Sequence, residues 1–377
     1  MQLWDKQFLG LDQNIKDFLP FQIKNPWNDA DSITARMLMS HSSSINNGNI
    51  SNFVTIGTPT IQLEYFLENY LSQGGQYYST VNYYNAIPGT VFHYDNYGIA
   101  LAGYLIEPLL GISFNQYARD SLLTPLGMNK SAWFLDELNM ENLAIGYTYS
   151  GGNFEPNPHL GHPAYPGLSL CTTALELVNY VMMLLNAGFI NDQNILSSDA
   201  VASMSTVQNP NWSYSYGIPG LGLFQREDFG DRTVWGHNGG SNGGYAAHFY
   251  FCKEENSGIV ITTNSEQYVN PIVEYLFDYA LTIPNISEEP EYRNVKMSVY
   301  PNPVSDQLTI SYQLKEAGTA LISIFSNNGQ LMETIGNEFK PTGEYRFVRN
   351  ISDYKPGVYF CRIQIGNEMV TKKIIKL

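Results

Sequence analysis

The chain has 377 residues, of which 44% are hydrophobic and only 15% charged, and its formal net charge is −15. This composition is typical of a globular protein, and the length predicts two domains, or one large domain with an appendage. The negative charge argues against nucleic acid and anionic membrane surfaces as partners, because both need clustered Lys and Arg to displace counterions. A small molecule, or a polymer without strong negative charge, is the expected partner.

Cysteines and apolar runs exclude further classes of protein. Cys171, Cys252 and Cys361 are widely scattered and lack the spacing of a zinc site or a disulfide framework, and no cofactor is expected. No uninterrupted apolar run approaches the roughly 18 residues that cross a membrane, which predicts no membrane span. Residues 1–20 carry charges among their apolar positions, which is not the pattern of a signal peptide.

Helical patterns fill most of the first half of the chain. Apolar residues recur there with helical spacing, and residues able to cap a helix precede several of these runs. The predicted helices cover residues 33–41 with Ser32 as cap, 61–71, a stretch from just after Asn96 to about 110, 114–123, and 175–185 with Thr172 or Thr173 as cap. Residues 130–170 are rich in aromatic residues, Gly and Pro, which favours loops and short strands over a cleft.

A section rich in strand signals follows these helices. Strands are predicted over residues 217–223, 233–235, 245–251 and 258–263, and a helix over 272–280 closes the section. Helices on both sides of an antiparallel section predict an α+β fold, built as a helix-sheet sandwich.

The composition changes after residue 282. Residues 283–295 are acidic, contain Pro and have few apolar residues, which is typical of a linker. Residues 296–377 contain short apolar runs separated by Asn-Gly or Pro-Gly turns, among them Asn328-Gly329 and Gly366-Asn367. This end of the chain is predicted to be a small Ig-like β-sandwich of about seven strands.

A first candidate site lies at Tyr94-Asp95-Asn96, where a loop with a Pro-Gly turn meets the helix that follows Asn96. Turn residues at such a junction can project a phenol and a carboxamide into a cleft, an arrangement that suits acid/base chemistry. The alternative is that Tyr94 is one of 27 ordinary tyrosines and that Asn96 is a helix cap.

A second candidate site is His237-Asn238-Gly239-Gly240. Glycines this dense beside a strand let the backbone approach a ligand closely and leave amides free to stabilise an oxyanion. The alternative is a Gly-rich hairpin turn with an exposed histidine. His159 and His162 could be two metal ligands, but no carboxylate or third histidine has convincing spacing. A loop near the mouth of the cleft is therefore the preferred interpretation, and no metal site is predicted.

Together, Tyr94-Asp95-Asn96 and His237-Asn238-Gly239 resemble the second and third motifs of the class C β-lactamase-like and penicillin-binding-protein-like serine hydrolase family. Its members share Ser-x-x-Lys, Tyr-x-Asn, and Lys- or His-x-Gly. Flanking segments match in order: residues 1–20 resemble the stretch after the nucleophile helix, 33–43 the "LLTHTSG" loop, 125–128 the "PLGM" turn and 166–170 the "PAGGL" strand. The resemblance covers residues 1–282 and implies a β-lactamase/transpeptidase-like sandwich for that domain.

The chain departs from the family pattern in two ways. The resemblance implies a Ser-x-x-Lys nucleophile shortly before Met1, so we expect the fold to be incomplete at its N-terminus, the sequence to be truncated there, and the chain as given to be inactive. The one Ser-x-x-Lys present runs from Ser352 to Lys355 in the C-terminal domain, which we interpret as coincidence. Ser44 stands where the family's loop usually has glycine, which puts the backbone of that loop in doubt.

By resemblance, the implied mechanism is acyl transfer from a serine. Tyr94 and the lysine would shuttle the proton, Asn96 would hydrogen-bond the substrate's amide, and the Gly240 amide would form half of the oxyanion hole. His237 replaces a lysine, and a neutral imidazole holds a carboxylate less firmly, which favours an esterase, a D-amino-acid peptidase or a peptidoglycan-type carboxypeptidase. The alternative is a catalytically inactive surface protein that binds peptidoglycan-like ligands in the same cleft.

The last 80 or so residues carry a second resemblance. Val299-Tyr300-Pro301-Asn302-Pro303-Val304, Asn328-Gly329-Gln330 and Pro356 to Phe360 are similar to the C-terminal sorting domain of the type IX secretion pathway. This resemblance implies that the secretion machinery is a partner and that the protein is secreted or held at the surface of a bacterial cell. A signal peptide is then expected upstream of Met1. The alternative is an accessory β-sandwich that binds glycan.

Overall fold

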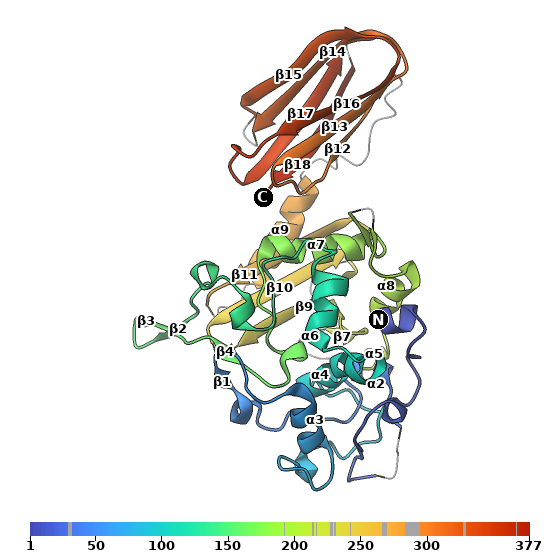
Figure 1. Ribbon diagram of the computed structural model, residues 1–377, viewed down its shortest axis with the longest axis vertical. Coiled ribbons are helices and arrows are strands. Elements are labelled where there is room, and N and C mark those ends of the chain that lie inside the picture. Colours follow the sequence, from blue (N-terminus) through green and yellow to red (C-terminus); the bar gives the residue numbers. More distant parts are fainter. Residues whose placement is uncertain are drawn as a thin grey trace. The chain divides into compact units, whose positions relative to one another are not determined.

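The computed structural model describes the chain except for residues 29–31, 192, 213–214, 216, 227–228, 230, 242, 266–269, 283–294, 327–328 and 367. It divides into two compact units, Met1–Ala280 and Leu281–Leu377 (Figure 1). The predicted linker at 283–295 falls outside the described residues apart from Val295, which begins the first strand of the second unit.

The centre of the first unit is a five-stranded antiparallel sheet in the order β11-β10-β9-β8-β7. Its strands are β7 (Ile218–Pro219), β8 (Phe224–Arg226), β9 (Val234–Ser241), β10 (Tyr245–Cys252) and β11 (Ser257–Thr263). Side chains of β10 alternate between the two faces of the sheet, as a strand requires. Phe249 and Phe251 pack in the main core, and Tyr250 and Cys252 pack in a separate cluster with Val273 and Phe277 of a helix.

Helices cover both faces of this sheet. Helix α7 (Ala174–Leu185) packs on β10 and β11, and α9 (Asn270–Thr282) supplies the apolar cluster on the other face (Figure 1). Thr173 is one of the two predicted caps, and it caps α7 by accepting a hydrogen bond from the Glu176 amide. The predicted α+β helix-sheet sandwich is therefore confirmed.

The rest of the first unit contains seven further α-helices, all short, among its described residues. They are α1 (Gln2–Asp5), α2 (Ala35–Met39), α3 (Leu63–Leu71), α4 (Asn96–Tyr104), α5 (Ile106–Leu110), α6 (Phe114–Ala118) and α8 (Ser198–Met204). A π-helical turn continues α6 over Arg119–Leu123. Three two-stranded ladders complete the unit: β1 (Thr55–Ile56) with β4 (Leu160–Gly161), β2 (Tyr147–Ser150) with β3 (Asn153–Pro156), and β5 (Phe189–Ile190) with β6 (Gln193–Asn194).

Two of the predicted helices differ from those observed. The cap of α2 is Thr34, which accepts from the Met37 amide at 3.2 Å, and not Ser32. The helix predicted from Asn96 to about 110 is broken at Leu105 into α4 and α5. Pro108 explains the break, because it has no amide hydrogen for the Tyr104 carbonyl, and its ring would clash with that carbonyl in a continuous helix.

The second unit is a β-sandwich. Its described strands are β12 (Val295–Tyr300), β13 (Gln307–Leu314), β14 (Gly318–Ser326), β15 (Leu331–Lys340), β16 (Gly343–Asn350), β17 (Gly357–Ile365) and β18 (Glu368–Lys376). They form one sheet in the order β12-β13-β16 and another in the order β15-β14-β17-β18. Ile310, Ile322, Ile324 and Ile363 lie in the core between them. The predicted β-sandwich is confirmed, although Asn328 and Asn367 of the predicted turns lie outside the described residues.

Within the described part of the chain, no single helix is long and apolar enough to cross a membrane. One sharply bent pair of segments, Asn96–Leu110 with Phe114–Leu123, meets the criteria of length and composition alone.

Candidate active site

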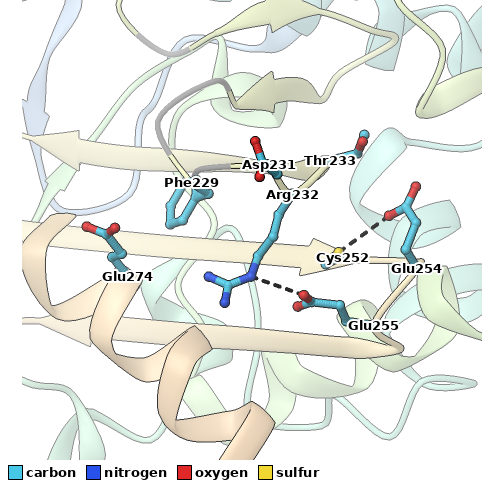
Figure 2. A pocket seen from close by; sticks show the side chains of 8 residues that line it. All are labelled: Phe229, Asp231, Arg232, Thr233, Cys252, Glu254, Glu255 and Glu274. Atoms are coloured by element: carbon cyan, nitrogen blue, oxygen red, sulfur yellow. Dashed lines mark hydrogen bonds and ion pairs between the residues drawn. The ribbon is translucent and has the colours of Figure 1, made fainter.

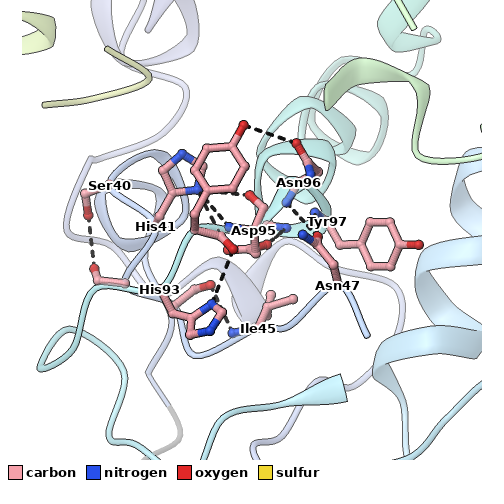
Figure 3. Close-up of polar contacts among 12 residues, drawn as sticks. Ser40, His41, Ile45, Asn47, His93, Asp95, Asn96 and Tyr97 are labelled. Atoms are coloured by element: carbon pink, nitrogen blue, oxygen red, sulfur yellow. Dashed lines mark hydrogen bonds and ion pairs between the residues drawn. The ribbon is translucent and has the colours of Figure 1, made fainter. Parts of the chain in front are cut away.

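Tyr94 and Asn96 lie at the junction between an extended segment and α4. The helix cap is Asp95, whose side chain accepts a hydrogen bond from the Gly98 amide, and Asn96 is the first helical residue (Figure 3). The Tyr94 hydroxyl donates to Asn96 Oδ1 at 3.4 Å. The alternative that Asn96 serves as the helix cap is therefore wrong, and its carboxamide contacts the phenol.

Asn47, which the sequence reasoning missed, completes the helix start. Its Oδ1 accepts from the Asn96 amide at 2.7 Å and from the Tyr97 amide at 3.2 Å (Figure 3). The first amides of a helix have no partner inside the helix, so they need side chains or water. Asn47 lies 49 residues upstream of Asn96, and no local pattern connects the two.

His41 lies under the Tyr94 ring. It is buried, its ring centroid is 4.4 Å from that of Tyr94, and its Nδ1 is 2.9 Å from the Asp95 carbonyl oxygen. Burial, together with the nearby His237 and His93, lowers the pKa of His41 to about 3, against the opposing hydrogen bond with the Asp95 backbone, so the imidazole is neutral at physiological pH. Its Nε2 has no hydrogen-bond partner among the described residues.

Asp95 is the second buried titratable group at this junction. Burial raises the pKa of Asp95 to about 8, against the opposing effect of the Gly98 amide, so the carboxyl holds its proton at neutral pH. Its Oδ2 lies 4.0 Å from His41 Nδ1 and has no hydrogen-bond partner among the described residues. Both groups beneath Tyr94 are therefore uncharged at pH 7.

His237 reaches the same place from the sheet. Its ring centroid lies 6.3 Å from that of Tyr94 and 5.4 Å from that of Phe224. The alternative of a hairpin turn is wrong here, because His237 is in β9, opposite Phe249 of β10, and the turn follows at Gly243 and Gly244. Burial lowers the pKa of His237, and its Nδ1 lies 2.6 Å from the Asn238 carbonyl oxygen. A neutral ring that donates from Nδ1 carries a lone pair on Nε2.

Gly239 and Gly240 continue along the exposed end of β9. A Cβ added at Gly239 would meet nothing within 4 Å, and one at Gly240 would meet only the Tyr245 carbonyl oxygen at 3.7 Å. Neither glycine is therefore required by packing. Among the described strands, β8 pairs with β9 only as far as Gly236, so beyond it β9 is paired on one edge, by β10. The other edge of this part of β9 is paired by no strand among the described residues.

Aromatic contacts connect these parts. Phe224 on β8 lies opposite Gly236 of β9, and its ring lies 5.8 Å from His41 and 6.3 Å from Tyr94. Tyr94, Asn96 and His237 are thus brought together over Phe224 and His41. Gly239 and Gly240 follow His237 along the same strand.

Ser44, where the resemblance implied glycine, adopts the glycine-like backbone. Its φ is 65°, in the left-handed region, and its hydroxyl donates to the Ala86 carbonyl at 2.9 Å. The loop therefore keeps the conformation that glycine favours, at some cost in backbone strain.

His159 and His162 take part in separate contacts. His162 Nε2 lies 3.2 Å from the Tyr97 hydroxyl, and its Nδ1 accepts from the Ala164 amide. Burial lowers the pKa of His162 to about 4. His159 Nδ1 instead lies 2.9 Å from the Tyr245 hydroxyl. No group of three or more His, Cys, Asp or Glu among the described residues could hold a metal ion.

A separate pocket lies at the other end of β9 and β10, beside Thr233 and Cys252 (Figure 2). Its volume is about 460 Å³, and it contains none of the predicted site residues. Its one arginine, Arg232, is paired with Glu255 at 3.1 Å and with Asp278 at 2.8 Å, so its charge is already neutralised.

Comparison with known proteins identifies both units. Residues 1–276 match the family model described as Beta-lactamase, and residues 298–377 match the Secretion system C-terminal sorting domain. Penicillin-binding protein 4 of Amycolatopsis lactamdurans is 28% identical over 268 residues, which cover 69% of this chain and 66% of that protein. Beta-lactamase-like protein 2 of Dictyostelium discoideum is 30% identical over 190 residues, 49% of this chain and 33% of that protein. The chain thus spans two thirds or less of these relatives.

Solved structures agree on the fold. The octameric penicillin-binding protein homologue from Pyrococcus abyssi superposes with a TM-score of 0.57 at 21% identity, covering 99% of this chain and 84% of that one. A D-stereospecific amidohydrolase from Streptomyces gives a TM-score of 0.53 at 20% identity, over 70% of this chain and 77% of that one. The sorting domain indicates a secreted or cell-surface protein. The chain belongs to the beta-lactamase family and carries a secretion system C-terminal sorting domain.

Proposed function

We propose that this chain forms the proton-transfer and substrate-binding part of a serine hydrolase that acts by acyl transfer. The substrate would be an ester, an amide or a peptidoglycan-like D-amino-acid compound. The observation that carries the proposal is the contact between the Tyr94 hydroxyl and Asn96 Oδ1 at 3.4 Å, with the His237 ring 6.3 Å from the Tyr94 ring. These three side chains come from two distant segments of the chain and lie close together.

Each site residue has a role in this mechanism. Tyr94 takes the proton from the nucleophile and returns it to the leaving group, and Asn96 holds the amide of the substrate. The Gly240 amide would donate to an oxyanion from the edge of β9 that β10 does not pair, and the empty space around a Cβ at Gly239 would admit the substrate. His237 borders the substrate from the sheet.

The mechanism also needs a serine and a lysine. We propose that both lie on coding sequence upstream of Met1, because the single Ser-x-x-Lys of the 377 residues, at 352–355, belongs to the sorting domain. A free phenol titrates near about 10, so Tyr94 is a poor base at neutral pH without a cation beside it. The upstream lysine would supply that cation.

His237 favours some substrates over others. With the pKa of His237 lowered by burial and Nδ1 directed to the Asn238 carbonyl, the ring offers an uncharged acceptor rather than a cation. Such a ring does not hold a carboxylate firmly. This supports an esterase or a D-amino-acid peptidase over an enzyme dedicated to β-lactams. A D-stereospecific amidohydrolase and a hydrolase with promiscuous acyltransferase activity share the fold, in agreement with such substrates.

A second candidate function is a catalytically inactive binding protein. One observation favours it: residues 1–282 contain no Ser-x-x-Lys. Such a protein would keep the cleft and hold peptidoglycan-like ligands at the cell surface without forming a covalent intermediate.

Labelling with a fluorescent penicillin and a fluorophosphonate separates the two functions. The protein is expressed both as residues 1–377 and with all coding sequence upstream of Met1. We expect covalent label on the longer protein, at a serine upstream of Met1, and none on the shorter one. Absence of label from both, combined with reversible binding of a peptidoglycan fragment, would reject the hydrolase and support the binding protein.

The second unit has its own proposed role. We propose that residues 296–377 bring the protein to the type IX secretion machinery, with 283–295 as the linker from the domain at 1–282. Residues 296–377 fused to a reporter with a signal peptide should reach the surface or the medium of a host that has this pathway. Export that is unchanged in a host without the pathway would reject this partner.

A further inference from the structure

We propose that Asn47 is a positioning residue for the Tyr94–Asn96 pair. It holds the start of α4 from a different loop, and this leaves the Asn96 side chain free to meet the substrate. The catalytic consequence rests on the proposed function, whereas the positioning itself concerns the hydrogen bonds of this chain alone.

The amides at the start of α4 need hydrogen-bond partners from outside the helix. Three consecutive amides, those of Asn96, Tyr97 and Gly98, would otherwise lack partners. The cap residue Asp95 takes the Gly98 amide. Asn47 Oδ1 takes the other two, at 2.7 Å and 3.2 Å (Figure 3). All three amides are therefore satisfied without using the Asn96 side chain.

The Asn96 side chain takes no part in capping its own helix. An asparagine that caps its own helix turns its carbonyl oxygen back onto the first amides. The Asn96 carboxamide instead accepts from the Tyr94 hydroxyl. Because Asn47 and Asp95 do the capping, Asn96 can combine a fixed backbone with a side chain available to the cleft.

Asn47 is itself held in place through its neighbour Asn46. The preceding residue, Asn46, donates its backbone amide to the Asn82 carbonyl at 2.8 Å and its side-chain amide to the Val81 carbonyl at 2.8 Å. The buried Tyr70 hydroxyl donates to the Asn46 carbonyl at 2.9 Å. Because Asn46 is anchored in this way, Asn47 Oδ1 has a defined position before any ligand binds.

The chain offers a matched control for Asn47. Asn49 lies two residues further along the same loop and performs the same kind of capping, with its Oδ1 accepting from the Ser51 amide at 3.2 Å. It caps the short 3-10 helix Ile50–Phe53 and has no hydrogen bond to Asn96. Asn49→Ala therefore removes an equivalent cap without touching the start of α4.

The experiment uses three variants of the full protein: Asn47→Ala, Asn47→Asp and Asn49→Ala. Asn47→Asp keeps an acceptor oxygen. Its negative charge is also favourable at the N-terminus of a helix. Amide hydrogen exchange is read at Asn96, Tyr97 and Gly98. In Asn47→Ala, the first two amides should exchange at least about tenfold faster, while Gly98 stays protected by Asp95. Asn47→Asp and Asn49→Ala should match the wild type.

Turnover gives the second measurement, on the protein that includes the upstream coding sequence. Asn47→Ala should lower kcat by about ten- to a hundredfold with KM within about twofold, because a small displacement of catalytic groups affects the chemical step. Asn47→Asp should restore most of kcat. Equal losses in Asn47→Ala and Asn49→Ala, or an unchanged kcat in Asn47→Ala, would overturn the proposal.

A wild-type protein without turnover would reject the proposed function, and not this inference. In that case the amide hydrogen exchange rates alone test the positioning by Asn47. Faster exchange confined to Asn96 and Tyr97 supports the positioning by Asn47, and unchanged exchange at both amides overturns it.

Discussion

The imidazole of His41 lies against the phenol ring of Tyr94, with 4.4 Å between the ring centroids and 32° between the planes. The backbone of His41 is in the left-handed region, with φ of 54°, which a non-glycine residue adopts only at a cost. The strained backbone of His41 thus places an uncharged imidazole ring against Tyr94, the residue that we assign to proton transfer.

Removing the His41 ring should loosen Tyr94 and destabilise the first unit. We expect His41→Ala to lower the free energy of unfolding by about 2–4 kcal/mol, because it leaves a cavity beneath Tyr94. His41→Phe keeps a ring there and loses the contact to the Asp95 carbonyl, so it should cost only about 1 kcal/mol. Urea unfolding of both variants checks the difference, and equal losses would show that the stacked ring does not support the junction.

Asp95 should make stability fall as the pH rises. The pKa of Asp95 is raised to about 8 in the folded protein, against about 4 when unfolded. Between these values the folded state binds more protons than the unfolded state, so the free energy of unfolding decreases with pH. Asp95→Asn keeps an acceptor for the Gly98 amide and does not titrate. The free energy of unfolding of Asp95→Asn minus that of the wild type should increase by more than about 1 kcal/mol between pH 4 and pH 8. If the free energies of unfolding of the two proteins changed in parallel with pH, this would contradict a protonated Asp95 carboxyl at neutral pH.

Exchanging His237 for lysine should change the preference for charged ligands. We expect His237→Lys to bind a penicillin with a free carboxylate at least about tenfold more tightly, because it supplies the missing cation. Binding of the methyl ester of the same compound should stay within about twofold. His237→Gln serves as the uncharged control and should leave both dissociation constants near those of the wild type. An equal gain for acid and ester would argue against a carboxylate-binding position here.

Two glycines of β9 should respond differently to an added methyl group. A Cβ at Gly239 meets nothing within 4 Å, so Gly239→Ala should change the free energy of unfolding by less than about 0.5 kcal/mol while it weakens substrate binding. A Cβ at Gly236 would lie 2.1 Å from the Phe249 carbonyl oxygen, so Gly236→Ala should destabilise by about 1–3 kcal/mol. Thermal unfolding and ligand titration of the pair check this. Unchanged binding in Gly239→Ala would indicate that no ligand approaches this face.

Local signals explain which parts of the fold were predictable. Thr173 caps α7, and the helix ends at Leu185 just before Asn186 and Gly188, as its cap and stop residues indicate. The sequence predicts that the glycine-rich part of β9 lies beside a strand and not within one, because glycine is disfavoured in strands. Its pairing with β10 from Val234 to Ser241 overrides that preference, and pairing between strands is not visible in a local window.

The candidate site was predictable only in its motif residues. Tyr94, Asn96 and His237 stand in short triplets that resemble the second and third motifs of the family. Asn47 contributes through contacts across 49 and 50 residues, made by a polar residue in a loop without periodicity. Only the folded arrangement shows that it holds the helix start.

The most direct test of the central claim is the effect of Tyr94→Phe on acyl transfer by the protein that includes the upstream coding sequence. The substitution removes only the hydroxyl that contacts Asn96, so the ring still stacks on His41 and the thermal unfolding curve should stay close to that of the wild type. Our account predicts that the rate of acylation by a labelled penicillin or an activated ester falls by about 10²- to 10⁴-fold. A rate within about twofold of the wild type would contradict the assignment of Tyr94 to proton transfer.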